Sequence, residues 1–129
     1  MGREPLEPKV MEIFFRKGEA TVREVLEEIN RDRERKLSLT TVSTVVSRLY
    51  RKGLLLRESA RGRGGTYYIY RPALTREEYE RRMVREAIDR LSRVLGKVVL
   101  LRFVEESASQ LNEEELRELL RRIRERSGK

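Results

Sequence analysis

The chain has 129 residues, 38% of them hydrophobic and 40% charged, and its formal net charge at pH 7 is +8. This length predicts one domain, or one small domain with an appendage, and the periodic apolar residues indicate a folded chain rather than a disordered one. Because the chain contains no cysteine and no histidine, disulfides, zinc fingers and catalysis by Ser-His or Cys-His pairs are excluded.

The first thirty residues predict two helices. Pro8 fits the first turn of a helix that ends at Lys17-Gly18, and the apolar face of this helix comprises Val10, Ile13 and Phe14. Thr21 and Glu24 then form a capping box for a second helix. Its buried stripe is expected to comprise Val22, Val25, Leu26 and Ile29.

A third helix is predicted from a Ser38 cap to Lys52, with Gly53 as its left-handed stop. Its apolar side comprises Val42, Val45, Val46 and Leu49. The opposite side is rich in threonine and serine, which are poor helix formers, and it carries arginine but no carboxylate. Such a face suits a helix in the major groove of DNA, because short hydroxyls permit close approach and arginine reaches guanine or phosphate. The candidate DNA-binding residues here are Thr40, Thr41, Thr44, Ser47, Arg48 and Arg51.

A hairpin follows the third helix. Leu54–Glu58 and Thr66–Arg71 are predicted strands, Pro72 ends the second strand, and residues 59–65 (SARGRGG) are expected to form a long, flexible tip. Arg61 and Arg63 on this tip are candidates to enter a minor groove or to bind a phosphate, and a plain glycine-rich turn remains compatible with that role. Three helices and a hairpin in this order predict a winged helix-turn-helix, a mainly α fold with a small β-hairpin.

The excess charge of the chain lies in this part of the sequence. Residues 31–71 contain 11 Lys/Arg and 3 acidic residues, so they account for the whole net charge of +8. Positive charge concentrated on one helix and the adjacent hairpin is typical of a protein that binds duplex DNA.

Two further patterns have a structural and a functional interpretation. Tyr68 and Tyr70 share a face of the second strand and resemble a stacking platform for single-stranded nucleic acid, but we expect them to pack the hairpin on the helices. The acidic clusters at 27–28 and 113–115 suit helix surfaces and the positive ends of helices better than a metal site. We therefore expect no metal, no cofactor and no enzymatic activity.

The remaining sequence predicts three helices. Thr75 and Glu78 cap a long helix to about Leu95, a fifth covers 97–107, and Asn112 and Glu115 cap a sixth. A heptad-like apolar seam passes through the long helix and includes Ile88, Leu91, Leu95 and Val98. These helices exceed what a winged domain needs to cover itself. We therefore expect a DNA-binding domain over residues 1–73 and a helical dimerisation region over residues 74–129.

The chain resembles the BlaI/MecI/CopY family of winged-helix repressors, which control penicillinase and copper-transport genes in some bacteria. The resemblance extends from about Glu7 to Ile123, and its most specific part is LTTVSTVVSRLYRKGLL leading into YYIYRPALTREEY. It implies a homodimer on an inverted repeat, a recognition helix that carries Thr40 to Arg51, and a C-terminal dimer region.

The chain departs from this family at two positions. Copper-responsive members carry Cys-x-Cys motifs near the C terminus, and this chain has no cysteine. Some relatives are cleaved before a phenylalanine that matches Phe103, where an asparagine is expected to precede it; here the preceding residue is Arg102.

The sequence therefore predicts a sequence-specific, double-stranded DNA-binding transcription regulator, a dimeric repressor on an inverted-repeat operator. The alternative is a winged-helix protein-interaction module of a transcription or chromatin assembly, because an anionic protein surface would match the same basic face. No apolar run approaches the ~18 residues of a membrane-spanning helix, so we expect a cytoplasmic protein with no membrane partner.

Overall fold

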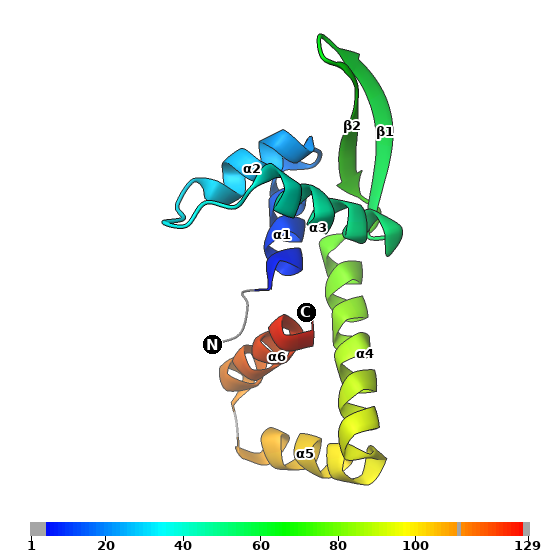
Figure 1. Cartoon of the computed structure of the whole chain (residues 1–129). Coiled ribbons are helices and arrows are strands. Elements are labelled where there is room, and N and C mark those ends of the chain that lie inside the picture. The colour runs from blue at the N-terminus through cyan, green and yellow to red at the C-terminus, as the bar shows by residue number, and fades with distance from the viewer. Residues whose placement is uncertain (1–4, 111, 128–129) are drawn as a thin grey trace. The chain divides into compact units, whose positions relative to one another are not determined.

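Three short helices and a two-stranded hairpin form the first of two units into which the chain divides, Met1–Tyr79 and Glu80–Lys129 (Figure 1). The structure, a computed structural model, describes residues 5–110 and 112–127. The elements in chain order are α1 (Leu6–Lys17), α2 (Val22–Asn30), α3 (Leu39–Arg51), β1 (Leu55–Gly62), β2 (Gly65–Pro72), α4 (Arg76–Leu95), α5 (Lys97–Gln110) and α6 (Glu113–Ser127). The predicted winged-helix architecture, mainly α with one small hairpin, is confirmed.

The helix ends form where their local sequence predicts them. The Glu24 N–H donates to the Thr21 hydroxyl at 3.2 Å, while the Thr21 N–H donates to the Glu24 carboxylate at 2.8 Å. Thr75 and Glu78 make the same reciprocal pair before α4. Gly18, after α1, adopts a φ of +88°, a conformation that glycine reaches without the steric cost of a side chain. Each cap satisfies backbone donors or acceptors that a helix end otherwise leaves unpaired.

The core of the first unit lies where the three helices meet the base of the hairpin. Its largest fully buried side chains are Phe14, Met11, Leu49, Leu54 and Leu55. Tyr70 is only 4% exposed, and its ring packs edge-on against those of Phe14 and Tyr50 at centroid distances of 6.5 and 6.3 Å. Tyr70 also exchanges two backbone hydrogen bonds with Ala20, each 2.9 Å long. The hairpin base is thus joined to the helices by both side chains and backbone.

The hairpin differs from the sequence-based expectation. The predicted long, flexible tip over residues 59–65 is wrong, because antiparallel pairing continues from Leu55↔Pro72 to Gly62↔Gly65. Only Arg63 and Gly64 remain in the turn, and Gly65 adopts a φ of +109° to close it. Glycine lowers strand propensity in isolation, but backbone pairing with the opposite strand overrides that local preference here.

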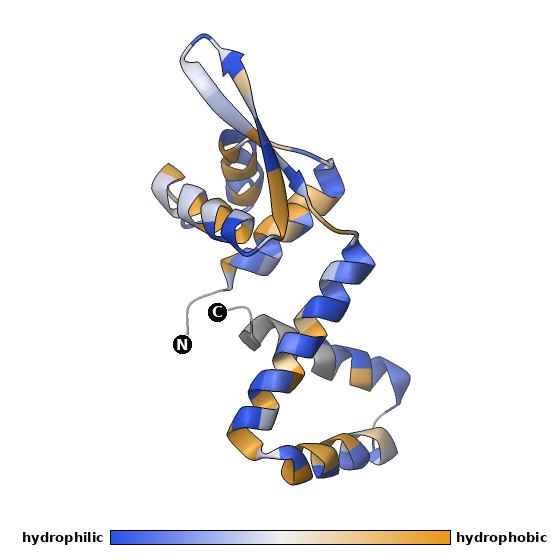
Figure 2. Cartoon of the chain, turned by 90° about the vertical axis from the view of Figure 1, so that its right-hand side faces the viewer, coloured by the Kyte–Doolittle hydropathy of each residue, from blue (hydrophilic) through white to orange (hydrophobic). Residues whose placement is uncertain are grey.

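The second unit contains the greater part of α4 and all of α5 and α6. Gly96 separates α4 from α5 with a φ of +79°, and α5 extends to Gln110, slightly beyond the predicted end at 107. Asn112 and Glu115 cap α6 as expected. Apolar and charged residues alternate along α4, and apolar residues are prominent on α5 (Figure 2). Within the described ranges, no helix is both long and apolar enough to cross a membrane.

Candidate nucleic-acid interface

The exposed face of α3 is defined by the side that α3 buries. Val42, Val45, Val46 and Leu49 are all at most 5% exposed and pack into the core. Thr40, Thr44, Arg48 and Arg51 are exposed, while Thr41 and Ser47 are half-buried on the flanks. The six candidate residues of this helix therefore lie outside the core. None of them belongs to the apolar face that packs α3 against the core.

The hydroxyls of α3 differ in what they leave available to a ligand. The Thr44 hydroxyl donates to the Thr40 carbonyl at 2.9 Å, and the Thr41 hydroxyl accepts from the Ser38 hydroxyl at 3.0 Å. Thr44 consequently retains acceptor capacity and Thr41 retains its own proton. The Ser47 hydroxyl makes no hydrogen bond to the part of the chain described. These hydroxyls offer a mixture of donors and acceptors along one exposed helix face.

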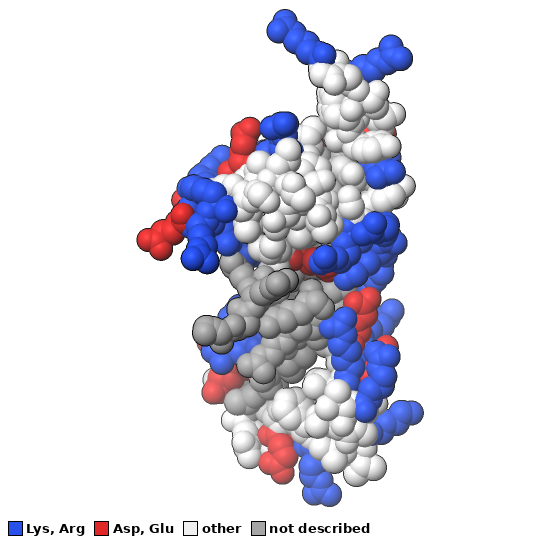
Figure 3. Space-filling model, viewed as in Figure 1, with Lys and Arg blue, Asp and Glu red and all other residues white. Residues whose placement is uncertain are grey.

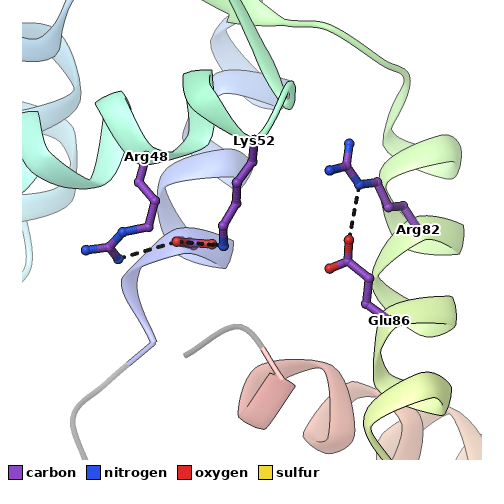
Figure 4. A network of polar contacts seen from close by, with 5 residues as sticks. Arg48, Lys52, Arg82 and Glu86 are labelled. Carbon is purple, nitrogen blue, oxygen red and sulfur yellow. Dashed lines mark hydrogen bonds and ion pairs between the residues drawn. The ribbon is translucent and has the colours of Figure 1, made fainter.

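A buried carboxylate lies beneath the C-terminal half of α3. The Glu7 side chain is 9% exposed, and it pairs with Lys52 at 2.9 Å and with Arg48 at 3.4 Å (Figure 4). Both cations point to the same α1 carboxylate, which fixes their direction and leaves the group of three with a net positive charge. By contrast, Arg51 makes no ion pair with any described carboxylate. The candidate Arg48 therefore forms an ion pair with α1. Arg51 extends from α3 without such an ion pair in the described chain.

The far end of the hairpin carries only positive charge in the view of Figure 3, where Lys/Arg side chains project from its tip. Arg61 pairs with Thr66 in the strand register, and Arg63 lies in the turn itself; both are exposed. The two-residue turn holds these side chains at the end of a regular hairpin. The hairpin that carries them packs against α3 at its base, so one unit presents both a helix and a hairpin that could contact DNA.

A third basic group surrounds the N-terminal end of α3. The connection between α2 and α3 carries Arg31, Arg33, Arg35 and Lys36. Its shape is fixed by Asn30, whose amide both donates to the Leu37 carbonyl at 3.0 Å and accepts from the Leu37 N–H at 2.8 Å. Arg31 is partly neutralised by Glu28 at 2.9 Å. The connection is therefore held in one conformation by hydrogen bonds and carries mostly basic side chains.

Sequence reasoning missed Arg57, a β1 residue whose side chain contacts both α3 and β2. Its guanidinium carbon is 4.0 Å from the ring centroids of both Tyr50 and Tyr68. A hydrogen bond to the Tyr70 hydroxyl, followed by smaller electrostatic contributions from the three tyrosines, raises the pKa of Arg57 above its ordinary value. The strand register could have indicated this contact, because Arg57 is directly opposite Tyr70. The expectation that Tyr68 and Tyr70 pack the hairpin on the helices is met by the buried Tyr70, while Tyr68 is 42% exposed and covers Arg57.

The candidate dimerisation residues lie in the second unit. Ile88, Leu95 and Val98 are 49%, 40% and 77% exposed, and Leu91 is half-buried. Several neighbours on α5 are also exposed apolar residues: Val99, Leu101, Phe103 and Val104.

In the ranges that the structure describes, no cluster of three or more acidic side chains could hold a metal ion.

Comparison with known proteins identifies the family. The family model described as penicillinase repressor matches residues 4–125. No curated protein matches the chain. Among solved structures, Stf76 from the Sulfolobus islandicus plasmid-virus pSSVx is similar at 19% identity and a TM-score of 0.43, over 58% of this chain and 90% of its own. Since the family match spans nearly the entire sequence and the fold is a winged helix, the chain belongs to the penicillinase repressor family of DNA-binding transcription regulators.

Proposed function

We propose that the protein is a repressor that binds an inverted-repeat operator in duplex DNA as a homodimer, with α3 in the major groove. The observation that carries this proposal is the exposed face of α3, which combines hydroxyls and arginine without a carboxylate above a fully buried valine face. The proposed DNA contacts are Thr40, Thr41, Thr44, Ser47, Arg48, Arg51, Arg61 and Arg63. We also propose that the protein works in the cytoplasm, where operator DNA would be accessible to it.

Different parts of the interface have different proposed roles. Arg51, which has no carboxylate partner in the described chain, is suited to a bidentate contact with guanine. Arg48 is held by Glu7, so we assign it to the phosphate backbone, as we do Arg61 and Arg63 on the hairpin. Phosphate contacts fix the register of the protein on DNA, while base contacts supply sequence preference.

The exposed apolar side chains of α4 and α5 support the homodimer. Large contiguous apolar patches are uncommon on monomers and usually mark interaction sites. One winged helix contacts only a few base pairs, and a two-fold dimer doubles the contacts and matches the symmetry of an inverted repeat. We therefore assign Ile88, Leu91, Leu95 and Val98 to the dimer interface.

Salt dependence provides a first test of duplex binding. If each protomer neutralises four or five phosphates, the dimer should show a slope of log K against log salt of roughly −7 to −9. Replacement of Arg61 and Arg63 by alanine should make the slope shallower and leave sequence preference unchanged. The measurement is fluorescence anisotropy with a labelled duplex over a series of salt concentrations. A flat salt response would favour the protein-interaction module instead.

Selection of bound sequences from a random duplex library tests the role of α3. Arg51→Ala should cost about 1–3 kcal/mol at the base pair that it contacts and relax preference there. Arg48→Ala should weaken all sequences about equally, because its proposed contact is a phosphate. Thr44→Ala and Ser47→Ala should shift the preferred motif without unfolding the protein, since neither side chain is part of the core.

Val45→Ala is the matched control on the opposite side of the same helix. Val45 is 5% exposed, so the variant should lose about 1–3 kcal/mol of stability through a cavity and still select the wild-type motif. Recovery of the wild-type motif at wild-type affinity by all four surface variants would show that α3 is not the recognition helix.

A further inference from the structure

The side chain of Arg57, on β1, contacts aromatic rings of both α3 and β2. Tyr50, from the last turn of α3, covers one side of its guanidinium, and Tyr68, from β2, also approaches to a centroid distance of 4.0 Å. Both distances are well within the range of a cation–π contact. Two aromatic rings from two different elements therefore fix the orientation of this planar cation.

The stack is anchored in the core through Tyr70. Arg57 lies directly opposite Tyr70 in the strand register, and the Tyr70 ring is 4% exposed and contacts Phe14, Tyr50 and Tyr68. A side chain ordered in this way has already lost much of its conformational entropy before any ligand arrives. Ligand binding then costs less entropy than it would with a free surface arginine.

The charge of Arg57 is not neutralised by a carboxylate of the described chain. Other arginines of the first unit do have acidic partners: Arg16 pairs with Glu28 at 3.1 Å, and Arg71 pairs with Glu58 at 3.9 Å. Arg57 instead has the rings of Tyr50 and Tyr68 beside its guanidinium. Contacts with aromatic rings do not use up the N–H donors of the guanidinium, and these donors suit the oxygens of a phosphate.

The strand register places Arg57 on a line with the proposed DNA contacts. Arg57 and Arg61 are four residues apart on β1, so they lie on the same face of the hairpin about 13 Å apart. Tyr50, which covers Arg57, directly precedes Arg51 on α3. Arg57 thus lies between the exposed end of α3 and the hairpin tip, where a bound duplex would continue from one to the other.

We propose that Arg57, held in its tyrosine stack, is a binding site for a backbone phosphate of duplex DNA at the junction of α3 and the hairpin. The proposal rests on the proposed function, because it assigns one more contact to the same DNA surface. It also gives the stack two roles: it orients the arginine, and it couples the angle of the hairpin to α3 through one side chain.

The salt dependence of DNA binding separates this role from a purely structural one. Arg57→Gln should make the slope of log K against log salt shallower by about 1 per protomer and should weaken binding roughly ten-fold per protomer at moderate salt. Arg71→Gln is the matched control, because Arg71 lies on the opposite face of the hairpin and already pairs with Glu58. It removes the same charge and should change the slope much less.

A second pair of variants tests the stack itself. Tyr68→Leu removes one ring and leaves the charge, so it should weaken binding several-fold while keeping the wild-type slope; Tyr68→Phe, which keeps the ring, should bind as the wild type does. Tyr68→Leu should add almost nothing in the Arg57→Gln background. A thermal melt of each variant without DNA confirms that the fold is intact.

The outcomes are distinct. An Arg57→Gln slope equal to the wild-type slope, whatever the loss of affinity, would overturn the phosphate contact and leave Arg57 as a structural link. A wild-type protein without salt-dependent DNA binding would instead overturn the proposed function, and the Arg57 site with it.

Discussion

Glutamate at both Ile88 and Leu95 is expected to convert the protein from a dimer to a monomer and to reduce operator affinity by about 10²- to 10⁴-fold. These two side chains are 49% and 40% exposed in the single chain, and two charges in an apolar interface cannot be buried without a partner. Loss of the second half-site contact removes the gain from effective concentration, which accounts for the size of the drop. Sedimentation of the variant at roughly tens of micromolar, a concentration suited to weak association, measures the oligomeric state. Fluorescence anisotropy at constant salt measures the loss of operator affinity.

Arg93→Glu is the control for this experiment. Arg93 lies on the opposite side of α4 from the seam, and its replacement changes the net charge by the same amount as the double variant. It should remain dimeric and bind DNA almost as the wild type does. A double variant that is still a dimer would refute the assigned interface, while a monomer with wild-type affinity would refute the need for a dimer.

Phe14→Ala is expected to lower the free energy of unfolding by about 3–5 kcal/mol, a large share of the stability of a small domain. Phe14 is 0% exposed and contacts the Tyr70 ring, so its truncation opens a cavity where α1 meets the base of the hairpin. Urea denaturation followed by circular dichroism gives the change in midpoint at constant slope.

The neighbouring Phe15 provides the control. It is half-buried and packs against Tyr79 at a centroid distance of 5.5 Å rather than in the core. Phe15→Ala should therefore cost clearly less than Phe14→Ala, although both remove the same atoms. Equal losses from the two variants would contradict the assignment of Phe14 to the centre of the core.

The features that sequence analysis predicted best are those determined by a few neighbouring residues. The capping boxes at Thr21 and Thr75 formed as expected because donor and acceptor are three residues apart on the same turn. The apolar side of α3 was equally predictable, since helical periodicity alone separates the valines from the hydroxyls. The exposed residues of the candidate interface follow from the same periodicity.

The features that sequence analysis missed depend on residues far apart in the chain. The ion pairs of Glu7 with Arg48 and Lys52 join positions 41 and 45 residues apart, and no local pattern indicates which acid meets which base. The lengths of β1 and β2 were underestimated because Gly62 and Gly65 disfavour strands locally and are held by pairing across the hairpin. Arg57 was missed for the same reason, since its three tyrosines come from two other elements.

Along α4, Arg82 and Glu86 form an i,i+4 pair at 3.2 Å, which a sequence pattern does indicate. Pairs within one helix can be read from spacing, whereas pairs between helices require the packing to be known first.

The two hydrogen bonds between Ala20 and Tyr70 attach the base of the hairpin to the helices, whereas the tip lies beyond this attachment. In the described part of the chain, the residues between Tyr68 and the tip are held in place by the pairing of β1 with β2. If the tip binds DNA as proposed, insertions, deletions or charge changes near Arg63 should alter how strongly the protein binds DNA without disturbing the folding of the helices. On the proposed function, natural variation or laboratory selection would adjust operator affinity through the tip and leave the sequence preference of α3 unchanged.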